Sequence, residues 1–158
     1  MLIVTGQVIA AVAVLANAVV YGTDVCGAVI TRSVYRKLDD VTVTMSAGWG
    51  HYYGDKRMPV VGGGGVVAAV LTLLIALVAG RTGATVAAGI TVAALLIWLA
   101  LYVRIAKPIN SQQTAAAQSG IIPPNARALQ DKWDSLLKYR VPLQFIAVAG
   151  LCAALVLF

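Results

Sequence analysis

The chain is poor in the residues that soluble enzymes use most. Only 11% of its 158 residues are charged, none of its acidic residues is a glutamate, and His51 is its one histidine. A soluble domain would carry about twice that share of charge. Because 60% of the residues are hydrophobic and the mean hydropathy is +0.87, the composition predicts an integral membrane protein.

Motifs that identify common cofactor and metal sites are also missing. Cys26 and Cys152 stand alone in apolar runs, so they are interpreted as small buried hydrophobic residues and not as zinc ligands. The run Gly62–Gly65 is followed by apolar residues and not by Lys-Ser/Thr, which excludes a phosphate-binding loop. His51 with Asp55 does not complete a metal-ligand set, and there is no dinucleotide fingerprint or pair of haem-ligating histidines. No cofactor is therefore predicted, although the sequence leaves a metal open.

The basic residues are concentrated in two segments between apolar runs. Five lie between the first and second runs, six lie between the third and fourth, and only Arg81 lies elsewhere. Because Lys and Arg near helix ends are retained in the cytoplasm, this pattern predicts two cytoplasmic connections and both termini on the non-cytoplasmic side, in the plasma membrane if the source is bacterial. The net charge of +6 is attributed to lipid headgroups and not to nucleic acid. The basic segments contain Arg32, Arg36, Lys37, Lys56 and Arg57, and then Arg104, Lys107, Arg127, Lys132, Lys138 and Arg140.

The apolar runs predict one all-α domain, an integral membrane four-helix bundle. The first run has no basic residues before it, which favours a retained helix over a cleaved signal peptide. Pro59 and Asn125 are expected to begin helices, Arg81–Gly83 to form a tight turn, and the polar residues 107–124 to form a loop. Pro142 is expected to kink the last helix. The predicted helices of the domain 1–158 cover about residues 2–30, 59–80, 84–106 and 126–157.

A polar stripe on the first helix is the clearest sign of an internal site. Asn17, Tyr21 and Asp24 are spaced four and three residues apart, so they share one face. Polar residues of membrane helices turn toward the protein interior, where partners exist. Two interpretations of Asp24 remain open: a carboxylate solvated at the membrane edge, or a buried carboxylate paired with Arg32 or Arg140.

The last helix carries a matching stripe at similar spacing. Trp133, Leu137, Arg140 and Gln144 follow one another at intervals of four, three and four residues. Arg140 either extends to the headgroups or faces inward at the depth of Asp24. The inward arrangement would form a pocket between helices, which is a common ligand site in bundles.

The segment Met45–Pro59 is rich in glycine and aromatic residues and holds the one histidine. It forms either an aromatic belt at the membrane interface or a flexible cover over the pocket. His51 is a reasonable general base, because an unperturbed imidazole has a pKa near neutrality.

Several short motifs in this order resemble a known membrane family. The chain has a Trp, a Tyr-Gly pair and a Met-Pro before the second helix, a Pro-x-Asn after the third, and a Trp followed by an Arg at the fourth. This pattern is similar to that of the four-helix membrane family that includes the fungal anthrone oxygenases, and it covers nearly the whole chain. The matching positions are Trp49, Tyr53, Gly54, Met58, Pro59, Asn110, Trp133 and Arg140.

The resemblance implies oxygenation of a polycyclic phenol, with anthrone to anthraquinone as the type reaction, and molecular oxygen as co-substrate. In this interpretation His51 or Asp24 removes a proton and Arg140 or Asn110 stabilises an oxyanion. A hydrophobic aromatic molecule would be held by Asn17, Tyr21, Trp49, Tyr53, Trp133 and Gln144. The alternative is a non-catalytic subunit or assembly factor that packs against larger membrane partners, and the sequence leaves open a homo-oligomer or a larger complex.

Overall fold

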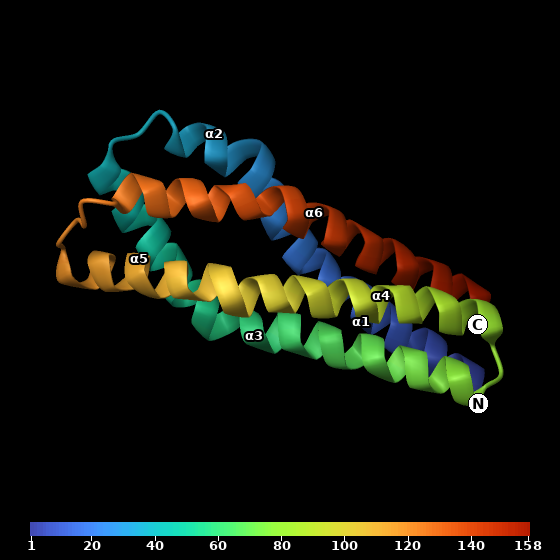
Figure 1. The fold of residues 1–158 in the computed structure, drawn as a ribbon. Helices are drawn as coiled ribbons and strands as arrows, with labels where there is room; N and C mark the ends of the chain where they lie inside the picture. Colours follow the sequence, from blue (N-terminus) through green and yellow to red (C-terminus); the bar gives the residue numbers. More distant parts are fainter.

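The computed structural model describes all 158 residues and is entirely helical. Four rods follow one another, and each is long and apolar enough to cross a membrane, as the sequence predicts. Both termini lie at one end of the bundle, and α2 and α5 lie at the other (Figure 1). The rods are α1 (Leu2–Cys26) with η1 (Gly27–Thr31) and α2 (Arg32–Tyr35); α3 (Asp40–Val78); α4 (Thr82–Leu101) with η2 (Tyr102–Ala106) and α5 (Lys107–Ser119); and α6 (Ala126–Leu157).

The expected start of the second helix at Pro59 is wrong. Helix α3 begins 19 residues earlier at Asp40, where Asp39 caps it by accepting a hydrogen bond of 2.9 Å from the Thr42 backbone N–H. Pro59 lies inside the helix, where it removes only one backbone hydrogen bond. The segment Met45–Pro59 is therefore part of a continuous helix and not a flexible cover.

The loop expected at residues 107–124 is also mostly wrong. Residues 107–119 form α5, because Ala and Gln are good helix formers even where the composition is polar. The helix ends at Gly120, whose φ of +70° suits a residue without a side chain. The π-helical turn η2 ends at Ala106, two residues before Pro108, which has no N–H to bond a carbonyl of the preceding turn. The tight turn between α3 and α4 lies at Gly80 with φ +67°, slightly before its expected place.

Small residues form the centre of the bundle. Helix α1 packs against α3 and α6, and α4 completes the ring by packing against the same two helices. Alanines with no exposed surface fill the core, and Gly6 and Gly150 lie against Phe158 and Thr91 so closely that an added Cβ would clash. Small residues allow membrane helices to approach closely, since dispersion contacts and not the hydrophobic effect hold them together.

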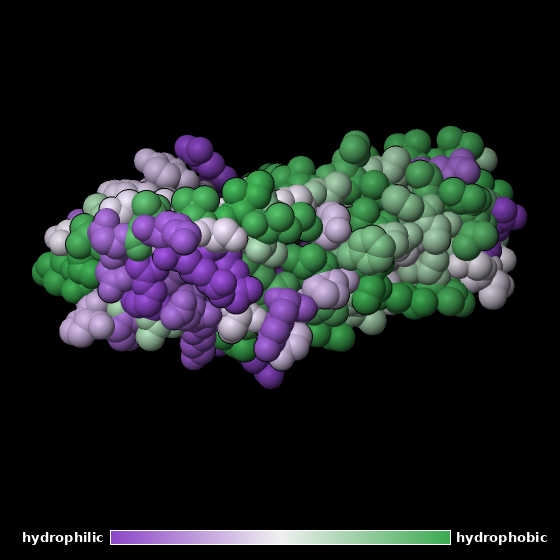
Figure 2. Space-filling model, turned by 90° about the horizontal axis from the view of Figure 1, so that it is seen from above, coloured by the Kyte–Doolittle hydropathy of each residue, from purple (hydrophilic) through white to green (hydrophobic).

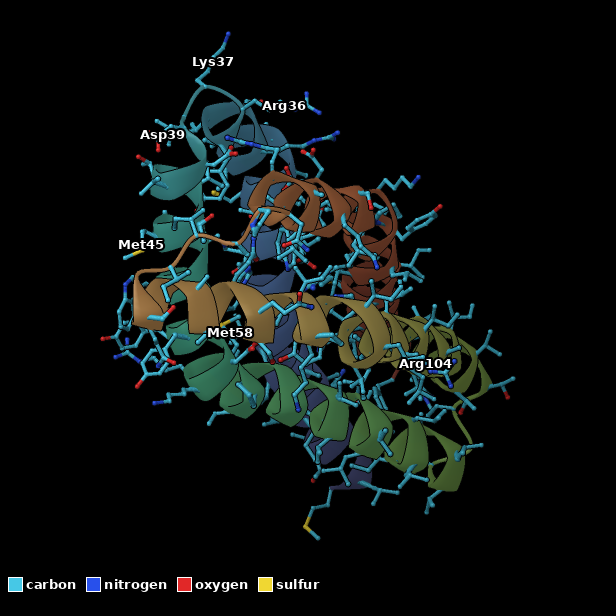
Figure 3. All side chains as sticks on the ribbon, turned by 60° about the vertical axis from the view of Figure 1, so that its left-hand side comes forward. Arg36, Lys37, Asp39, Met45, Met58 and Arg104 are labelled. Carbon is cyan, nitrogen blue, oxygen red and sulfur yellow. The ribbon has the colours of Figure 1, made fainter.

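The outer surface divides into an apolar part and a charged end. Figure 2 shows apolar residues over the half that carries the termini and hydrophilic residues gathered toward α2 and α5. Lys37 extends away from the bundle after α2 (Figure 3). Cys26 and Cys152 are both exposed, so the expectation that they are buried is wrong.

Candidate functional site

A buried ion pair joins α1 to α6. The Asp24 carboxylate is 2% exposed and receives Nη2 of Arg140 at 2.9 Å and Nε of Arg140 at 3.1 Å. Trp98 Nε1 of α4 donates a third contact to Asp24 at 3.2 Å. This arrangement confirms that Asp24 pairs with Arg140 and not with Arg32. A carboxylate with three donors is largely satisfied, and this one holds three helices together.

Aromatic rings surround the guanidinium of Arg140. Its carbon lies 5.1 Å from the ring centroid of Trp98 and 5.7 Å from that of Trp133, both within the range of cation–π attraction. Tyr102, one turn after Trp98, stacks on it with the ring planes 9° apart. Arg140 is therefore held in an aromatic frame and does not extend to the headgroups.

A second carboxylate, that of Asp55 on α3, is at the centre of a separate series of side-chain hydrogen bonds. Its Oδ1 accepts from the Tyr102 hydroxyl at 2.8 Å and from Asn110 Nδ2 at 3.0 Å. Asn110 Oδ1 in turn accepts from Trp133 Nε1 at 3.0 Å. Sequence reasoning missed the roles of Asp55, Tyr102 and Trp98. The signal was their four-residue spacing, which places His51 with Asp55 and Trp98 with Tyr102 on shared helix faces.

A third polar cluster lies at the charged end. Gln113 Nε2 donates to Gln130 Oε1 at 2.9 Å, and Gln130 Nε2 donates to Asp134 Oδ1 at 2.9 Å. All three side chains are buried. Gln113 Oε1 and Arg32 Nε are buried here without a hydrogen-bond partner.

His51 stands between these clusters. Its ring centroid lies 5.4 Å from that of Trp133, and its Nε2 is buried without a hydrogen-bond partner. A buried, unpaired ring nitrogen is costly, and such groups in folded proteins call for a functional explanation.

These groups meet at a cavity of about 900 Å³ that opens between the helices. This volume is within the range of pockets that hold small organic ligands. All four residues predicted as catalytic line it, and so does Trp133 among those predicted to bind substrate. The polar and aromatic lining residues are Thr23, Asp24, Thr31, Tyr35, His51, Asp55, Trp98, Tyr102, Asn110, Gln130, Trp133, Asp134 and Arg140.

The other five residues predicted to bind substrate lie outside the cavity. Asn17 is buried and donates to the carbonyls of Ala13 and Gly65. Gln144 has no exposed surface, and neither its amide oxygen nor its nitrogen has a partner. The remaining three, Tyr21, Trp49 and Tyr53, pack against other aromatic rings, with Tyr21 on Phe145 and Trp49 on Tyr52 and Tyr53.

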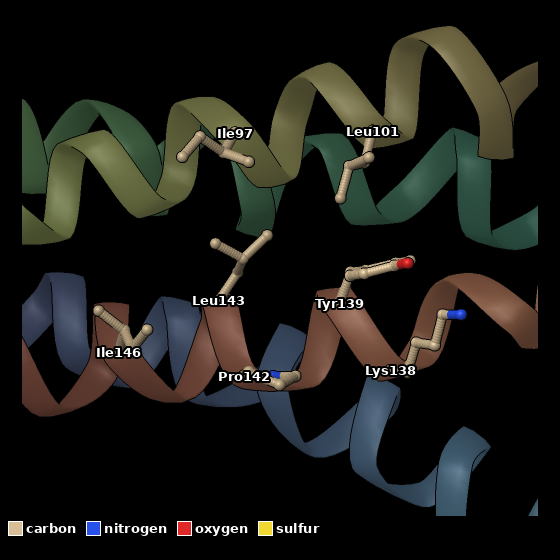
Figure 4. Close-up of a pocket in the computed structure, with 7 residues that line it drawn as sticks. All are labelled: Ile97, Leu101, Lys138, Tyr139, Pro142, Leu143 and Ile146. Carbon is tan, nitrogen blue, oxygen red and sulfur yellow. The ribbon is translucent and has the colours of Figure 1, made fainter.

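A smaller hollow of about 390 Å³ lies between α4 and α6 and has an apolar lining. Ile97 and Leu101 of α4 face Leu143 and Tyr139 of α6 across it (Figure 4). It contains no acid or histidine, Lys138 and Tyr139 are the polar residues of its lining, and it lies among exposed aliphatic side chains. Across the whole chain, no three His, Cys, Asp or Glu side chains are grouped so that they could hold a metal ion.

Comparisons with protein-family models, with curated proteins and with solved structures give no match to this chain. The resemblance to the anthrone oxygenase family therefore rests on the sequence motifs alone.

Proposed function

We propose that this chain is a membrane-embedded oxygenase of a flat, hydrophobic phenol, with oxidation of an anthrone to an anthraquinone as the type reaction. The observation that carries the proposal is the cavity that brings together Asp24, His51, Asn110, Trp133 and Arg140. These residues come from all four rods and are far apart in the chain. A purely structural polar network would not need to enclose a space of ligand size.

The chemistry requires little from the protein. The CH₂ of an anthrone is acidic, because its carbanion is delocalised over two aromatic rings and the carbonyl. Loss of that proton gives an enolate that can transfer one electron to O₂, and recombination of the radical pair with a proton forms a C–O bond as a hydroperoxide. Loss of water then gives the quinone, so one O₂ is consumed and one H₂O is released per anthrone. The protein needs to bind the rings, accept a proton and stabilise the enolate oxygen.

The contacts distinguish the roles of the candidate residues. The Asp24 carboxylate is occupied by Arg140 and Trp98, so it positions Arg140 and is a poor proton acceptor. His51 has a nitrogen without a partner, and a neutral imidazole accepts a proton, so His51 is the proposed base.

Arg140 is the proposed stabiliser of the enolate oxygen. Asp24 engages two of its five guanidinium N–H groups, which leaves donors for the substrate. Asn110 is already bonded to Asp55 and Trp133, so it orients these groups.

A non-catalytic subunit is the second candidate function. It is favoured by the exposed aromatic group on α3, where Trp49 is 39% and Tyr53 is 49% exposed beside Lys56 and Arg57. Such a surface suits a protein partner as well as lipid headgroups. Asp24, Arg140 and His51, however, face the cavity and not this surface, which favours the oxygenase.

Oxygen uptake in nanodiscs with an anthrone-like phenol tests the proposal. His51→Gln, which keeps the side-chain size but removes the base, is expected to lower turnover by about 10²- to 10⁴-fold. Gln112→Ala, at an exposed site on α5, is the matched control and is expected to keep wild-type turnover. Wild-type turnover in His51→Gln would exclude that base, and loss of turnover with a chelator would show that a metal takes part. Absence of uptake with any such phenol would favour the subunit.

A further inference from the structure

The first rod (α1, η1 and α2) and α3 lie side by side and are joined by polar contacts at both ends of the cavity. Toward the termini, Asn17 Nδ2 donates to the Gly65 carbonyl at 3.2 Å. Toward the charged end, the hydroxyls of Tyr35 and Ser46 are 2.9 Å apart. The π-helical turn η1 lies between these contacts along the chain, and π-helical turns within α-helices are frequent at functional sites. The stretch between the two contacts is called the α1–α3 seam below.

The α1–α3 seam is rich in glycine, so few side chains project from it into the cavity. Six glycines line the cavity, two from the first rod and four from α3. At four of these positions an added Cβ would meet no protein atom within 4 Å, and at the other two, Gly27 and Gly62, it would make only ordinary van der Waals contacts. Glycine weakens a helix relative to alanine, so glycines that no neighbour requires carry a cost without a packing gain. The four with open space are Gly22, Gly50, Gly54 and Gly63.

The wall across from these glycines is aromatic, and one end of the cavity is polar. Trp98 and Tyr102 stack there, and Trp133 lies near them over Arg140. His51 and Asp55 lie one turn apart on the glycine-rich face of α3. A smooth wall facing flat rings, with acid–base groups at one end, suits a flat amphipathic molecule.

The seam opens toward the bilayer. Val19, Gly22 and Thr23 on α1 and Gly63 on α3 line the cavity and are also exposed on the outer surface. Exposed Lys56 and Arg57 mark the headgroup level on α3, and Gly63 lies about 10 Å deeper at the rise of an α-helix. The apolar end of the opening is therefore inside the hydrocarbon layer, and its polar end is at the headgroups.

We propose that a flat, uncharged ring compound dissolved in the bilayer enters sideways through the α1–α3 seam. Its apolar edge lies at Gly22 and Gly63, and its oxygenated edge reaches His51, Asp55 and Arg140. This inference rests on the proposed function for the substrate class. It adds the route of entry and the orientation of the substrate.

Binding of an uncharged hydroxyanthraquinone in nanodiscs tests the seam. The probe quenches tryptophan fluorescence, and in a Trp49→Phe background both remaining tryptophans line the cavity. Gly63→Leu is expected to weaken binding by about tenfold or more, because the side chain fills the opening. Gly64→Leu is the matched control, since Gly64 also has open space around it but does not line the cavity. Equal binding by the two leucine variants would overturn the inference.

Two further measurements keep the result decisive. Thermal unfolding shows whether Gly63→Leu folds, and if it does not, Gly22→Leu serves instead because a Cβ there also meets no atom. An anthraquinone sulfonate, which stays out of the hydrocarbon layer, is expected to bind at least about tenfold more weakly than the uncharged probe. Equally tight binding of the sulfonate would show entry from water and would overturn the membrane route.

The outcomes separate this inference from the oxygenase proposal. The probe is already a quinone, so its binding does not depend on oxygen chemistry. If probe binding depends on Gly63 but no oxygen uptake is found, the proposed entry route is supported and the proposed oxygenase activity is contradicted. Wild-type oxygen uptake in Gly63→Leu would remove the seam and leave the oxygenase.

Discussion

Asp24 and Arg140 are 116 positions apart in the sequence, yet their side chains form a two-contact ion pair with Arg140 only 7% exposed. Removing two charges from water is costly, and their attraction repays this only where the geometry is good and the remaining groups are bonded. Here Trp98 supplies the additional hydrogen bond, and two aromatic rings face the guanidinium. The pair fixes the position of α6 against α1 at the edge of the cavity.

Removing one member of the pair should destabilise the fold more than removing both. Arg140→Met leaves the Asp24 carboxylate buried without its counter-charge and is expected to cost about 3–5 kcal/mol of unfolding free energy. The double variant Asp24→Leu/Arg140→Met is expected to lose clearly less, because it leaves no isolated charge. Reversible unfolding in detergent micelles measures both. A double variant that is less stable than Arg140→Met would contradict this account of the pair.

Tyr102 should contribute stability through its bond to Asp55. Tyr102→Phe removes the 2.8 Å hydrogen bond to the carboxylate and keeps the ring that stacks on Trp98, so a loss of about 1.5–3 kcal/mol is expected. Tyr139→Phe is the control, because Tyr139 is 53% exposed and lies at the hollow between α4 and α6, away from Asp55. Equal unfolding free energies for the two variants would show that the Asp55 contact is not stabilising.

Asp39, which caps the start of α3, should make the thermal stability depend on pH at low pH. Hydrogen bonds from the side chain and then the backbone of Thr42 hold the pKa of Asp39 below its usual 3.8. A carboxylate with a lowered pKa contributes stability above its unfolded pKa, and this contribution is lost as the pH falls through its folded pKa. Asp39→Asn should therefore flatten the loss of thermal stability below about pH 4. Asp131→Asn, at an exposed site on α6, should leave the pH dependence unchanged, and the same flattening there would rule out the cap as its cause.

Both termini are expected to lie outside the cytoplasm, and single-cysteine labelling tests this. Cys26 and Cys152 are exposed and would react, so both are first replaced by serine. A cysteine added after Phe158 should then react with a membrane-impermeant maleimide from outside intact cells, whereas one at Lys37 should react only after lysis. The reverse pattern would invert the topology and place the charged end outside.

The helical stripes account for what the sequence predicted well about the site. Asn17 and Asp24 on the first rod and Arg140 and Gln144 on the last are all buried, as their spacing indicates. Spacing did not reveal that Asn17 and Gln144 lie outside the cavity. Burial depends only on which face of its own helix a residue occupies. Whether that residue also lines a cavity depends on the space that the side chains of the facing helix leave unfilled.

The charged half of the molecule was predicted least well. Residues 45–58 and 107–119 are helical, although their glycines, prolines and polar side chains resemble those of loops. In water such segments are marginal as helices. Here each continues an apolar helix that is already formed, so no new helix nucleus is needed.

The sequence by itself determined that the chain has four apolar helices and which faces of them are polar, because hydropathy and the helical period are local properties. Only the tertiary structure decided which polar groups meet. Asp55 accepts hydrogen bonds from Tyr102 and Asn110, and Asn110 accepts one from Trp133. These four side chains meet because of the way the helices are aligned against one another, which is their register. That register is set by close contacts between distant residues, such as Asn17 against Gly65, and no local pattern encodes them.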